Sequence, residues 1–396
     1  MRTYHCDIVI VGAGPAGSMT AKSASENGAK VIFIEEHDKP GVPVYCGEGL
    51  SYKGIKDAGL EPIPGLVVQK INKAKVFAPS KKCIELTGED WTGYIMNRDV
   101  FDQAVADQAV EAGATLMLNT TATGVIKENI GVIGVNAIQE GEPIQIWAKI
   151  IIAADGHASL IRRSAGLDRW FEDYVSCAQY QLGGLSLDEP NANEFYVGTD
   201  LAPGGYAWVF PKSSEVANVG IGVRRTHTKP AIEYLKEFIK ADPRFENAVI
   251  LNKNGGICPV SGTLEKIVDN GFMMVGDAAG QLIPMTGAGI HTSIEAGKIA
   301  GKVAAEAVKN GDVSARILAE YPKKFEEYWG KRIESSGKVL EMLDKFSNED
   351  LNNLAEVMTN EDVLDLANGI NVPGALARIV SRSPLKIIGL IRAYLK

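Results

Sequence analysis

The sequence has little of what marks metal centres and secreted folds. Its 396 residues include five cysteines without C-x-x-C spacing and five histidines without an H-E-x-x-H motif. An odd number of scattered cysteines is typical of a reducing compartment, and the N-terminus does not resemble a signal peptide. We therefore expect a cytoplasmic protein that binds no metal and has no disulfide framework.

Long apolar runs and basic clusters are also missing. No stretch of about eighteen consecutive apolar residues occurs, so the sequence predicts no transmembrane helix. The formal net charge is −8 and no basic stripe with interleaved aromatics is found, so we expect no nucleic-acid partner. Hydrophobic content of 45% is that of a globular protein, long enough for two domains or one large domain with an insertion.

The N-terminal segment carries the most informative pattern of the chain. Asp7–Val11 is a short β-branched run that predicts a buried parallel strand, and Gly12–Gly17 follows it directly as G-x-G-x-x-G. A helix over 18–27 and a second strand over 30–34 complete the unit. A lone G-x-G-x-x-G would indicate only a turn, but in this context it predicts dinucleotide binding.

Each residue of this loop has its own expected task. Gly12 permits the tight turn, Gly14 lets the backbone approach a pyrophosphate, and Gly17 lets helix and strand pack closely. The pyrophosphate would bind at the positive end of the helix, where unpaired N–H groups point at it. Glu35 ends the second strand and is expected to accept from an adenosine ribose hydroxyl, which disfavours NADP at this loop.

The next part of the chain alternates between loop, strands and helix. Residues 37–50 are rich in glycine and proline and predict an extended loop. Alternating apolar and polar residues predict antiparallel strands over 60–95, and Asn97-Arg98-Asp99 begins a helix that Gly113 ends.

A three-stranded meander is expected next, with strands over 114–118, 131–135 and 144–152. It would bring the chain back into the first sheet at Ala154-Asp155-Gly156. Residues 170–262 predict a second, mostly antiparallel sheet, with strands at 177–183, 206–210 and 217–223 and a helix at 231–241.

The last third of the chain returns to the first domain and then becomes helical. Gly271–Gly280 contains a buried strand that ends in Asp277, and a long helix follows from about Ile290 to Lys309. The remainder, 315–396, is predicted to be predominantly helical.

FAD explains the separated motifs better than NAD. It is long enough to extend past the first loop, so that Asp277 can accept from a ribityl hydroxyl. Gly287 and Gly289, at the next helix start, offer N–H groups to the flavin pyrimidine edge. The helix dipole there favours the negative charge of a reduced flavin. Taken alone, Gly276-Asp277-Ala278-Ala279-Gly280 would be an ordinary strand-to-helix turn.

These motifs resemble the FAD-dependent p-hydroxybenzoate hydroxylase-like superfamily over roughly residues 1–310. Pro43-Val44-Tyr45-Cys46-Gly47-Glu48-Gly49 and Pro203-Gly204-Gly205-Tyr206-Ala207-Trp208-Val209-Phe210-Pro211 narrow the resemblance to the geranylgeranyl reductase family, in particular archaeal enzymes that saturate isoprenoid chains of membrane lipids. The resemblance implies FAD contacts at Pro15, Ala16, Glu35, Cys46, Gly47, Gly49, Arg98, Ala122, Asp277, Gly289 and Ile290. We add Gly12, Gly14, Gly17, Asp155 and Gly287 as cofactor-binding residues.

Tyr206, Trp208 and Phe210 alternate along a predicted strand and therefore project from one face. Their rings would line a slot for a long apolar chain, or alternatively fill the core between the two sheets. We favour the pocket, because Gly204 and Gly205 bring backbone close beside the row.

The cysteines divide into one candidate and several packing residues. Cys46 lies in a glycine-rich loop and is our candidate for a catalytic residue near flavin N5 that relays or orients a proton. We assign Cys83, Cys177 and Cys258 to packing. For Tyr45, Glu48 and His291 the alternatives are a role near the flavin and a structural role, and we favour the structural one.

The fold class predicted is α/β (α+β overall): a Rossmann-like FAD-binding parallel sheet with a three-stranded β-meander, a second mostly antiparallel substrate-domain sheet, and a helical C-terminal region. The FAD-binding domain comprises 1–68, 96–168 and 265–312. The substrate domain comprises strands in 69–95 and the catalytic part 169–264, and 313–396 forms the helical region.

The sequence also bears on partners. A second G-x-G-x-x-G is absent, so the electron donor, NAD(P)H or ferredoxin, must meet the flavin transiently. After Asp365 no acidic residue follows, while Arg378, Arg382, Lys386, Arg392 and Lys396 give the tail a charge of +5. The tail is either an amphipathic helix in peripheral contact with a membrane or a helix docked on the protein body.

Our hypothesis is an FAD-dependent reductase of isoprenoid C=C bonds in geranylgeranyl chains of a glycerophospholipid. Hydride would come from flavin N5, and a proton would reach the other alkene carbon inside a water-poor slot. The alternatives are a flavin monooxygenase or halogenase of the same superfamily, and a flavin electron carrier without turnover.

Overall fold

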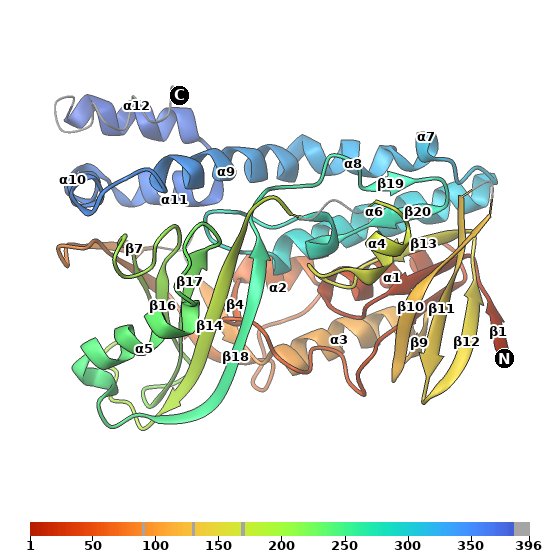
Figure 1. Cartoon of the computed structure of the whole chain (residues 1–396), viewed down its shortest axis with the longest axis horizontal. Helices are drawn as coiled ribbons and strands as arrows, with labels where there is room; N and C mark the ends of the chain where they lie inside the picture. The colour runs from red at the N-terminus through yellow and green to blue at the C-terminus, as the bar shows by residue number, and fades with distance from the viewer. Residues whose placement is uncertain (89–91, 129–130, 168–170, 384–396) are drawn as a thin grey trace.

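The computed structural model describes residues 1–88, 92–128, 131–167 and 171–383. These residues form an elongated molecule in which two large sheets lie at opposite ends and helices run along its length (Figure 1). The predicted class, a parallel Rossmann-like sheet with a second, mostly antiparallel sheet and a helical C-terminal region, is confirmed.

The six-stranded sheet of the first domain is mainly parallel. Its order is β19 (Val268–Asp269), β20 (Phe272–Met274), β13 (Ile150–Ala153), β2 (Ile8–Val11), β3 (Val31–Ile34) and β9 (Thr115–Met117). The strands β2, β3 and β13 are buried along their whole length, as expected for β-branched runs covered on both faces. The carboxyl ends of β2 and β20 therefore lie at the same edge of the sheet.

The predicted meander was wrong in its strand assignment. Residues 115–117 belong to the six-stranded sheet, and 142–153 divide into two strands with Ala148 and Lys149 between them. The meander instead comprises β10 (Thr120–Glu128), β11 (Gly131–Gln139) and β12 (Glu142–Trp147), with β1 (Arg2–His5) added in parallel to β12. β10 was not predicted because a register shift between Ala122 and Gly124 breaks its alternation.

Helix α6 (Ile290–Asn310) packs unusually close to α1 (Pro15–Glu26). A Cβ atom at Gly297 would lie 2.7 Å from the carbonyl oxygen of Ala16, and one at Gly301 would lie 2.4 Å from that of Thr20. These pairs advance in the same direction along both helices, so the helices are parallel and begin at the same end. The two N-termini therefore both lie at the edge of the sheet where β2 ends.

The second sheet has seven strands in the order β18 (Val249–Pro259), β14 (Tyr174–Gly183), β17 (Val216–Arg224), β16 (Ala207–Pro211), β15 (Ala192–Tyr196), β6 (Lys73–Phe77) and β7 (Cys83–Thr87). All neighbours are antiparallel except β15 and β6. Strands β14, β16, β17 and helix α5 (Ala231–Ala241) are confirmed, whereas β15 and β18 were not predicted.

A small sheet of β4 (Gly49–Ser51), β8 (Gly93–Met96) and β5 (Val67–Ile71) lies between the two large ones, beside α2 (Tyr52–Asp57) and α3 (Arg98–Glu111). Asn97 is the N-cap residue of α3, and Asp99 lies within its first turn. The predicted strands of 60–95 thus divide: β6 and β7 extend the seven-stranded sheet, and β5 and β8 form this one.

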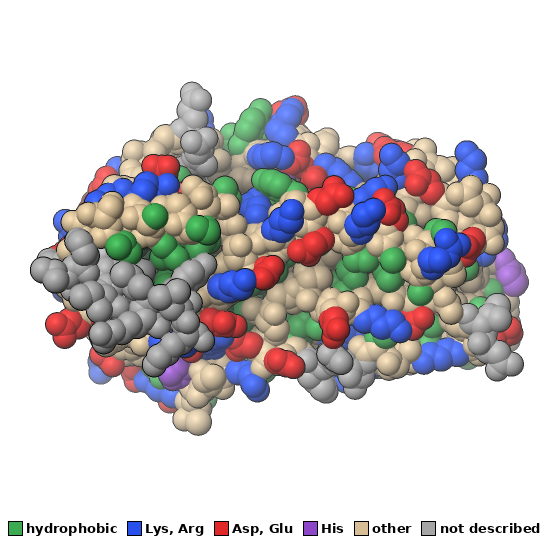
Figure 2. Space-filling model, turned by 90° about the horizontal axis from the view of Figure 1, so that it is seen from above, with side chains coloured by type: hydrophobic (Ala, Val, Ile, Leu, Met, Phe, Trp, Pro, Cys, Tyr) green, Lys and Arg blue, Asp and Glu red, His purple; other side chains and the backbone are tan. Residues whose placement is uncertain are grey.

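The C-terminal region is helical up to Arg382. It comprises α7 (Ala315–Leu318), α8 (Glu320–Phe325), a π-helical turn (Glu326–Gly330), α9 (Lys331–Leu343), α10 (Asn348–Val357), α11 (Asn360–Asn368) and α12 (Val372–Arg382). The short helix α4 (Leu160–Ser164) belongs to the preceding part of the chain. Acidic and basic side chains are interspersed on the face seen in Figure 2. The C-terminal helices carry such pairs at helical spacing, as in Glu320–Lys324 and Glu334–Lys338.

Two of the five basic residues of the tail are neutralised. Arg378 bonds to Asp362 (2.9 Å) and Asp365 (2.7 Å), and Arg382 pairs with Asp362. Lys386, Arg392 and Lys396 lie outside the described residues, as does the predicted amphipathic helix around 385–395. Among the helices that the structure describes, none has the length and apolar character needed to cross a membrane.

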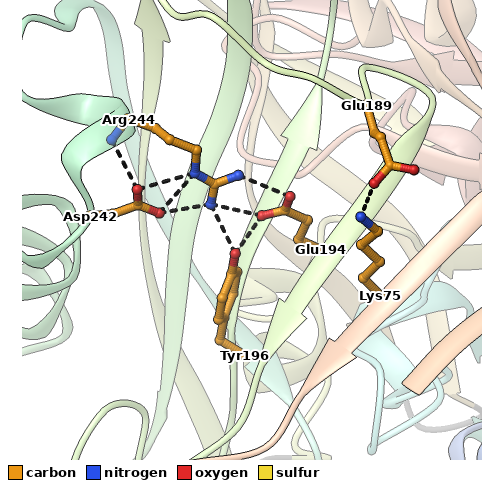
Figure 3. Close-up of polar contacts among 6 residues, drawn as sticks. All are labelled: Lys75, Glu189, Glu194, Tyr196, Asp242 and Arg244. Carbon is orange, nitrogen blue, oxygen red and sulfur yellow. Dashed lines mark hydrogen bonds and ion pairs between the residues drawn. The ribbon is translucent and has the colours of Figure 1, made fainter. Parts of the chain in front are cut away.

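An ion-pair cluster fixes the outer side of the seven-stranded sheet (Figure 3). The Arg244 guanidinium donates to both oxygens of Glu194 (2.9 Å each), to Asp242 (2.7 Å) and to the Tyr196 hydroxyl (2.9 Å). Burial lowers the pKa of Arg244, but the two carboxylates outweigh burial and raise it above its usual value. The cluster ties the 3₁₀ turn Pro243–Phe245 after α5 to strand β15.

We predict that Arg244→Met lowers the free energy of unfolding by about 2–3 kcal/mol, because it leaves Glu194 and Asp242 without their cation. The value is below that of a fully buried pair because the Arg244 side chain is 32% exposed. Urea unfolding measures it. Lys266→Met, which breaks the exposed pair with Asp269, is the control and should change stability by less than about 0.5 kcal/mol. Equal effects would contradict the prediction.

Candidate flavin and substrate site

The first loop joins β2 to α1 as the spacing predicts. A Cβ at Gly17 would lie 1.9 Å from the carbonyl oxygen of Gly12, so any other residue there would force the loop off the helix. Gly14 is the N-cap residue of α1, and a Cβ there would meet nothing within 4 Å. Pro15 and Ala16 form the first turn, where helical N–H groups have no partner within the helix. The loop thus offers open backbone to an anion.

Glu35 stands directly beside this loop. Its carboxylate accepts from the Ala13 N–H (3.0 Å) and from His37, through the backbone N–H (3.2 Å) and Nδ1 (2.7 Å). The Thr120 N–H donates to the Glu35 carbonyl oxygen (2.8 Å), which brings the start of β10 next to the end of β3. Ala122 follows two residues later on β10, half-buried, so it lies on the same side of the domain as Glu35.

Asp155 is placed at the edge of the sheet but has partners of its own. Its carboxylate accepts from the Ser159 hydroxyl (2.5 Å) and from the Ile161 N–H (3.0 Å), at the start of α4 (Leu160–Ser164). Burial raises the pKa of Asp155, although both hydrogen bonds oppose the shift. These bonds give Asp155 a structural role in this structure, and its contact with a cofactor stays a prediction.

Asp277 is the opposite case, because its carboxylate accepts no hydrogen bond within the described residues. It follows β20 in a 3₁₀ turn, and a Cβ at Gly289 would lie 3.2 Å from its Oδ1. Burial raises the pKa of Asp277, while the charges of His157 and Arg98 act in the opposite direction. Asp277 is half-buried, and a carboxylate that is partly removed from water and has no donor is suited to accept from a ligand hydroxyl.

Gly287, Gly289 and Ile290 lead into α6 next to Asp277. Gly289 is the N-cap residue, and Ile290 begins the helix. Gly287 has φ +66°, and a Cβ there would lie 3.7 Å from the Cys258 sulfur. The N-terminus of a helix of this length favours negative charge close by.

The Cys46 loop lies against the seven-stranded sheet. The Cys46 sulfur accepts from the Glu48 N–H (3.2 Å) and faces the Arg98 guanidinium, which is paired with Asp102 (2.7 Å). Burial lowers the pKa of Arg98, but Asp102 and Cys46 outweigh it, so Arg98 stays charged. Gly47 and Gly49 pack against the ring of Phe210. A Cβ added at Gly47 would lie 3.1 Å from the nearest ring carbon, and one added at Gly49 would lie 3.7 Å from it.

The aromatic row of Tyr206, Trp208 and Phe210 also packs against neighbouring residues and loops. Tyr206, Trp208 and Phe210 do share one face, and Phe195 from β15 packs edge-on against Tyr206 and Phe210. The Tyr206 hydroxyl donates to the Thr286 carbonyl oxygen (2.5 Å), in the loop before α6. Trp208 is 8% exposed and lies over Gly220, so this residue also fills core. The row therefore contacts both the Cys46 loop and the loop before α6.

Polar side chains of the sheet hold the Cys46 loop, and sequence reasoning did not identify them. Lys212 donates to Glu48 (2.6 Å), Asn218 donates to the same carboxylate (2.7 Å), and Gln179 donates to the Cys46 carbonyl oxygen (3.0 Å). The signal available was a polar residue at an inward position of an apolar strand, as in Gln179 and Asn218. Their partner, more than a hundred residues away, leaves no local pattern.

Cys177, Cys258 and His291 pack among their neighbours as expected, and each also has a polar contact through its side chain. Cys177 and Cys258 lie on neighbouring strands with their sulfurs 4.0 Å apart, beside Tyr206. The hydrogen bond with Cys177 and burial raise the pKa of Cys258, so this thiol stays protonated. His291 bonds to Asp57 (2.7 Å) and packs edge-on against Trp329, which fits its structural interpretation.

The residues of the expected site therefore form two groups. The first contains the 12–17 loop, Glu35 and Ala122. The second contains Cys46, Arg98, Asp277, Gly289 and the aromatic row. An extended dinucleotide fits this arrangement, with open backbone at the first group and, at the second, a half-buried carboxylate that accepts no hydrogen bond within the described residues. Asp155 lies between α4 and β13 and is occupied by its own hydrogen bonds.

Comparison with known proteins decides the family. The profile of an FAD dependent oxidoreductase matches residues 7–173, and that of a geranylgeranyl reductase catalytic domain matches residues 173–258. The digeranylgeranylglycerophospholipid reductase 2 of Methanopyrus kandleri is 39% identical over 386 residues, covering 96% of each chain. The chain belongs to the geranylgeranyl reductase family. It is an FAD-dependent oxidoreductase, as the family profiles require.

Further relatives support this assignment. The digeranylgeranylglycerophospholipid reductase of Methanocaldococcus jannaschii is 39% identical, covering 96% of this chain and 95% of the relative. The crystal structure of a geranylgeranyl bacteriochlorophyll reductase-like protein from Thermoplasma acidophilum superposes with a TM-score of 0.89 at 32% identity, covering 99% and 100% of the two chains. A flavin-dependent brominase, at 20% identity and a TM-score of 0.74, shows the shared fold alone.

We predict that Asp277→Asn weakens FAD binding about tenfold or more, through loss of a charge-assisted hydrogen bond. It should also stabilise the apoprotein. Because the native pKa of Asp277 lies above its usual value of 3.8, native Asp277 holds its proton more tightly than the unfolded chain does. Apoprotein stability is therefore lost as pH rises through the native pKa.

Thermal unfolding of apoprotein measures the second effect. The gain in melting temperature from Asp277→Asn should be larger at pH 7.5 than at pH 5, and FAD titration at pH 7.5 gives the affinity. Asp269→Asn, at the exposed end of β19, is the control. A variant that binds FAD as well as the parent would remove Asp277 from the cofactor site.

Proposed function

We propose that the protein saturates isoprenoid carbon–carbon double bonds in the geranylgeranyl chains of an archaeal-type glycerophospholipid, in membrane lipid biosynthesis. The observation that carries this proposal is the near full-length similarity, at 39% identity, to proteins named digeranylgeranylglycerophospholipid reductase. The aromatic row beside the Cys46 loop supports it, because a long apolar chain needs a water-poor slot of apolar faces.

The flavin, when bound and reduced, supplies the hydride that such a reduction needs. The chain's own residues then have to orient the double bond, exclude water and deliver a proton where cationic character develops. Cys46 is our candidate for the residue that holds or orients this proton. Arg98 faces its sulfur, and the Glu48 N–H donates to it, so the thiol is held in one orientation. Tyr206, Trp208 and Phe210 would line the chain.

The remaining site and domain assignments belong to the same proposal. The FAD-binding domain would comprise 1–68, 96–168 and 265–312, and the substrate domain 69–95 and 169–264. The adenosine and pyrophosphate would contact the 12–17 loop, Glu35 and Ala122, with Asp155 near them. The flavin end would contact Cys46, Gly47, Gly49, Arg98, Asp277, Gly287, Gly289 and Ile290.

Two partners are proposed besides the lipid. The electron donor, NAD(P)H or ferredoxin, would meet the flavin transiently, since the sequence has one G-x-G-x-x-G only. Peripheral contact with the inner membrane surface would come from Lys386, Arg392 and Lys396, because Arg378 and Arg382 are already paired with carboxylates.

Anaerobic single turnover tests the reaction. Reduced holoenzyme mixed with unsaturated lipid in the absence of oxygen should become reoxidised, and mass spectrometry should find two hydrogens gained per double bond. Fully saturated lipid is the control. Flavin that stays reduced until oxygen is admitted would contradict the proposal and point to a monooxygenase or halogenase. Flavin that is reoxidised by protein acceptors but never by lipid would indicate an electron carrier.

Cys46→Ala should slow lipid reduction at least tenfold while FAD binding changes little, because the alanine removes the thiol and leaves the loop in place. Cys83→Ala, on strand β7, is the matched control and should keep the rate of the parent. The rate of flavin reoxidation by lipid measures both. A Cys46→Ala protein that reduces lipid normally would exclude the thiol from the mechanism.

A further inference from the structure

The Cys46 peptide is held by one buried side chain of the seven-stranded sheet. Gln179, in the middle of β14, is 3% exposed, and its Nε2 donates to the Cys46 carbonyl oxygen (3.0 Å). Its other end accepts from Trp208 Nε1 (2.8 Å). Because indole nitrogen is a donor only, the amide oxygen of Gln179 must face Trp208 and its NH₂ must face Cys46. The orientation of this amide is therefore fixed.

The residues that follow Cys46 are anchored separately. Asn218 and Lys212 both bond to the Glu48 carboxylate, and the Met96 N–H donates to the Glu48 carbonyl oxygen (2.9 Å). Glu48 itself has φ +68°, a conformation that a non-glycine residue adopts only when its surroundings hold it. These contacts fix Glu48, and Asn218 also donates to the Gly47 carbonyl oxygen (3.3 Å), so the peptide after Gly47 is held as well. The peptide before Gly47, whose oxygen belongs to Cys46, is held by Gln179, and glycine has no side chain that would restrict its rotation.

The bond from Gln179 therefore determines how the peptide between Cys46 and Gly47 is turned. If that peptide rotates, the Cys46 sulfur leaves the Glu48 N–H and the Arg98 guanidinium. We propose that Gln179, oriented by Trp208, is a positioning residue that holds the Cys46 thiol at the reaction site. This inference rests on the proposed function of Cys46. It gives Trp208 a task beyond lining the apolar slot.

Two substitutions distinguish the effect of the hydrogen bond that Gln179 donates from the effect of the shape of its side chain. Gln179→Glu keeps the size of the side chain and an acceptor for Trp208, and its ionised carboxylate cannot donate to the Cys46 carbonyl oxygen. Because burial favours the protonated acid, which can donate, this variant and the parent are compared at high pH, where the acid is ionised. Gln179→Met keeps the length and removes both bonds. Gln181 lies two residues along β14 on the same face, half-buried, so Gln181→Glu and Gln181→Met are the matched controls. If shape alone mattered, Gln179→Glu would behave like the parent.

The first readout is anaerobic lipid reduction by the reduced holoenzyme. We expect both Gln179 variants to lose about tenfold in rate, while both Gln181 variants stay within twofold of the parent. In a Cys46→Ala background, the Gln179 substitutions should have no further effect, because they act through the thiol. Losses that multiply in the double variants, or a Gln179→Glu protein as fast as the parent, would overturn the proposal.

The second readout needs no turnover. Iodoacetamide modification of the oxidised holoenzyme, followed peptide by peptide, gives the rate for Cys46 and, as an internal control, for Cys83. The Cys46 rate should change at least threefold in the Gln179 variants and not in the Gln181 variants, with Cys83 unchanged throughout. An unchanged Cys46 rate would overturn the positioning role. A parent protein that reduces no lipid, with a changed Cys46 rate, would overturn the proposed function and leave the positioning role standing.

Discussion

The close packing of α6 on α1 sets the geometry on which the site depends. Glycines 297 and 301 let the backbones of the two helices approach within the distance that a Cβ would need. The helices are parallel, and Gly297 lies opposite Ala16, so α6 begins about six residues further out than α1. At 1.5 Å per residue, the N-terminus of α6 extends about 9 Å past that of α1. In the proposed site, the end of α1 would bind the pyrophosphate and the end of α6 would lie near the ring system beyond it.

The seven-stranded sheet completes this arrangement from the other side. Its face carries Gln179, Phe210 and Lys212, which hold the Cys46 loop, and Tyr206, which bonds to the loop before α6. Both segments that the proposal places at the flavin are thus bonded to the part of the sheet that the geranylgeranyl reductase profile covers, residues 173–258. The contacts that pack the two domains together are therefore also the contacts that position the proposed site. The seven-stranded sheet would position the Cys46 loop and the loop before α6 as well as enclose the substrate.

Much of this could be predicted from the sequence where the signal is local. The 12–17 loop, the strand before Asp277, and helices α5 and α6 follow from periodicity, glycine spacing and caps within short windows. Strands β10, β15 and β18 were missed because their pairing is non-local or, for β10, interrupted by a register shift. The Gln179–Trp208 and Glu48–Lys212 contacts join residues far apart in the chain, which periodicity does not report. The interpretation of Trp208 as pocket wall also omitted its second contact with Gln179.

A crystal structure of the FAD-loaded protein with a bound unsaturated lipid would locate both ligands relative to the Cys46 loop. We expect adenosine beside Glu35, a ribityl hydroxyl on Asp277, and the ring between the Cys46 loop and the start of α6. We also expect a double bond between the ring and the Tyr206–Phe210 row, with the Cys46 sulfur still at the Glu48 N–H. A ring bound away from Cys46, or an isoprenoid chain outside the aromatic row, would contradict the proposal.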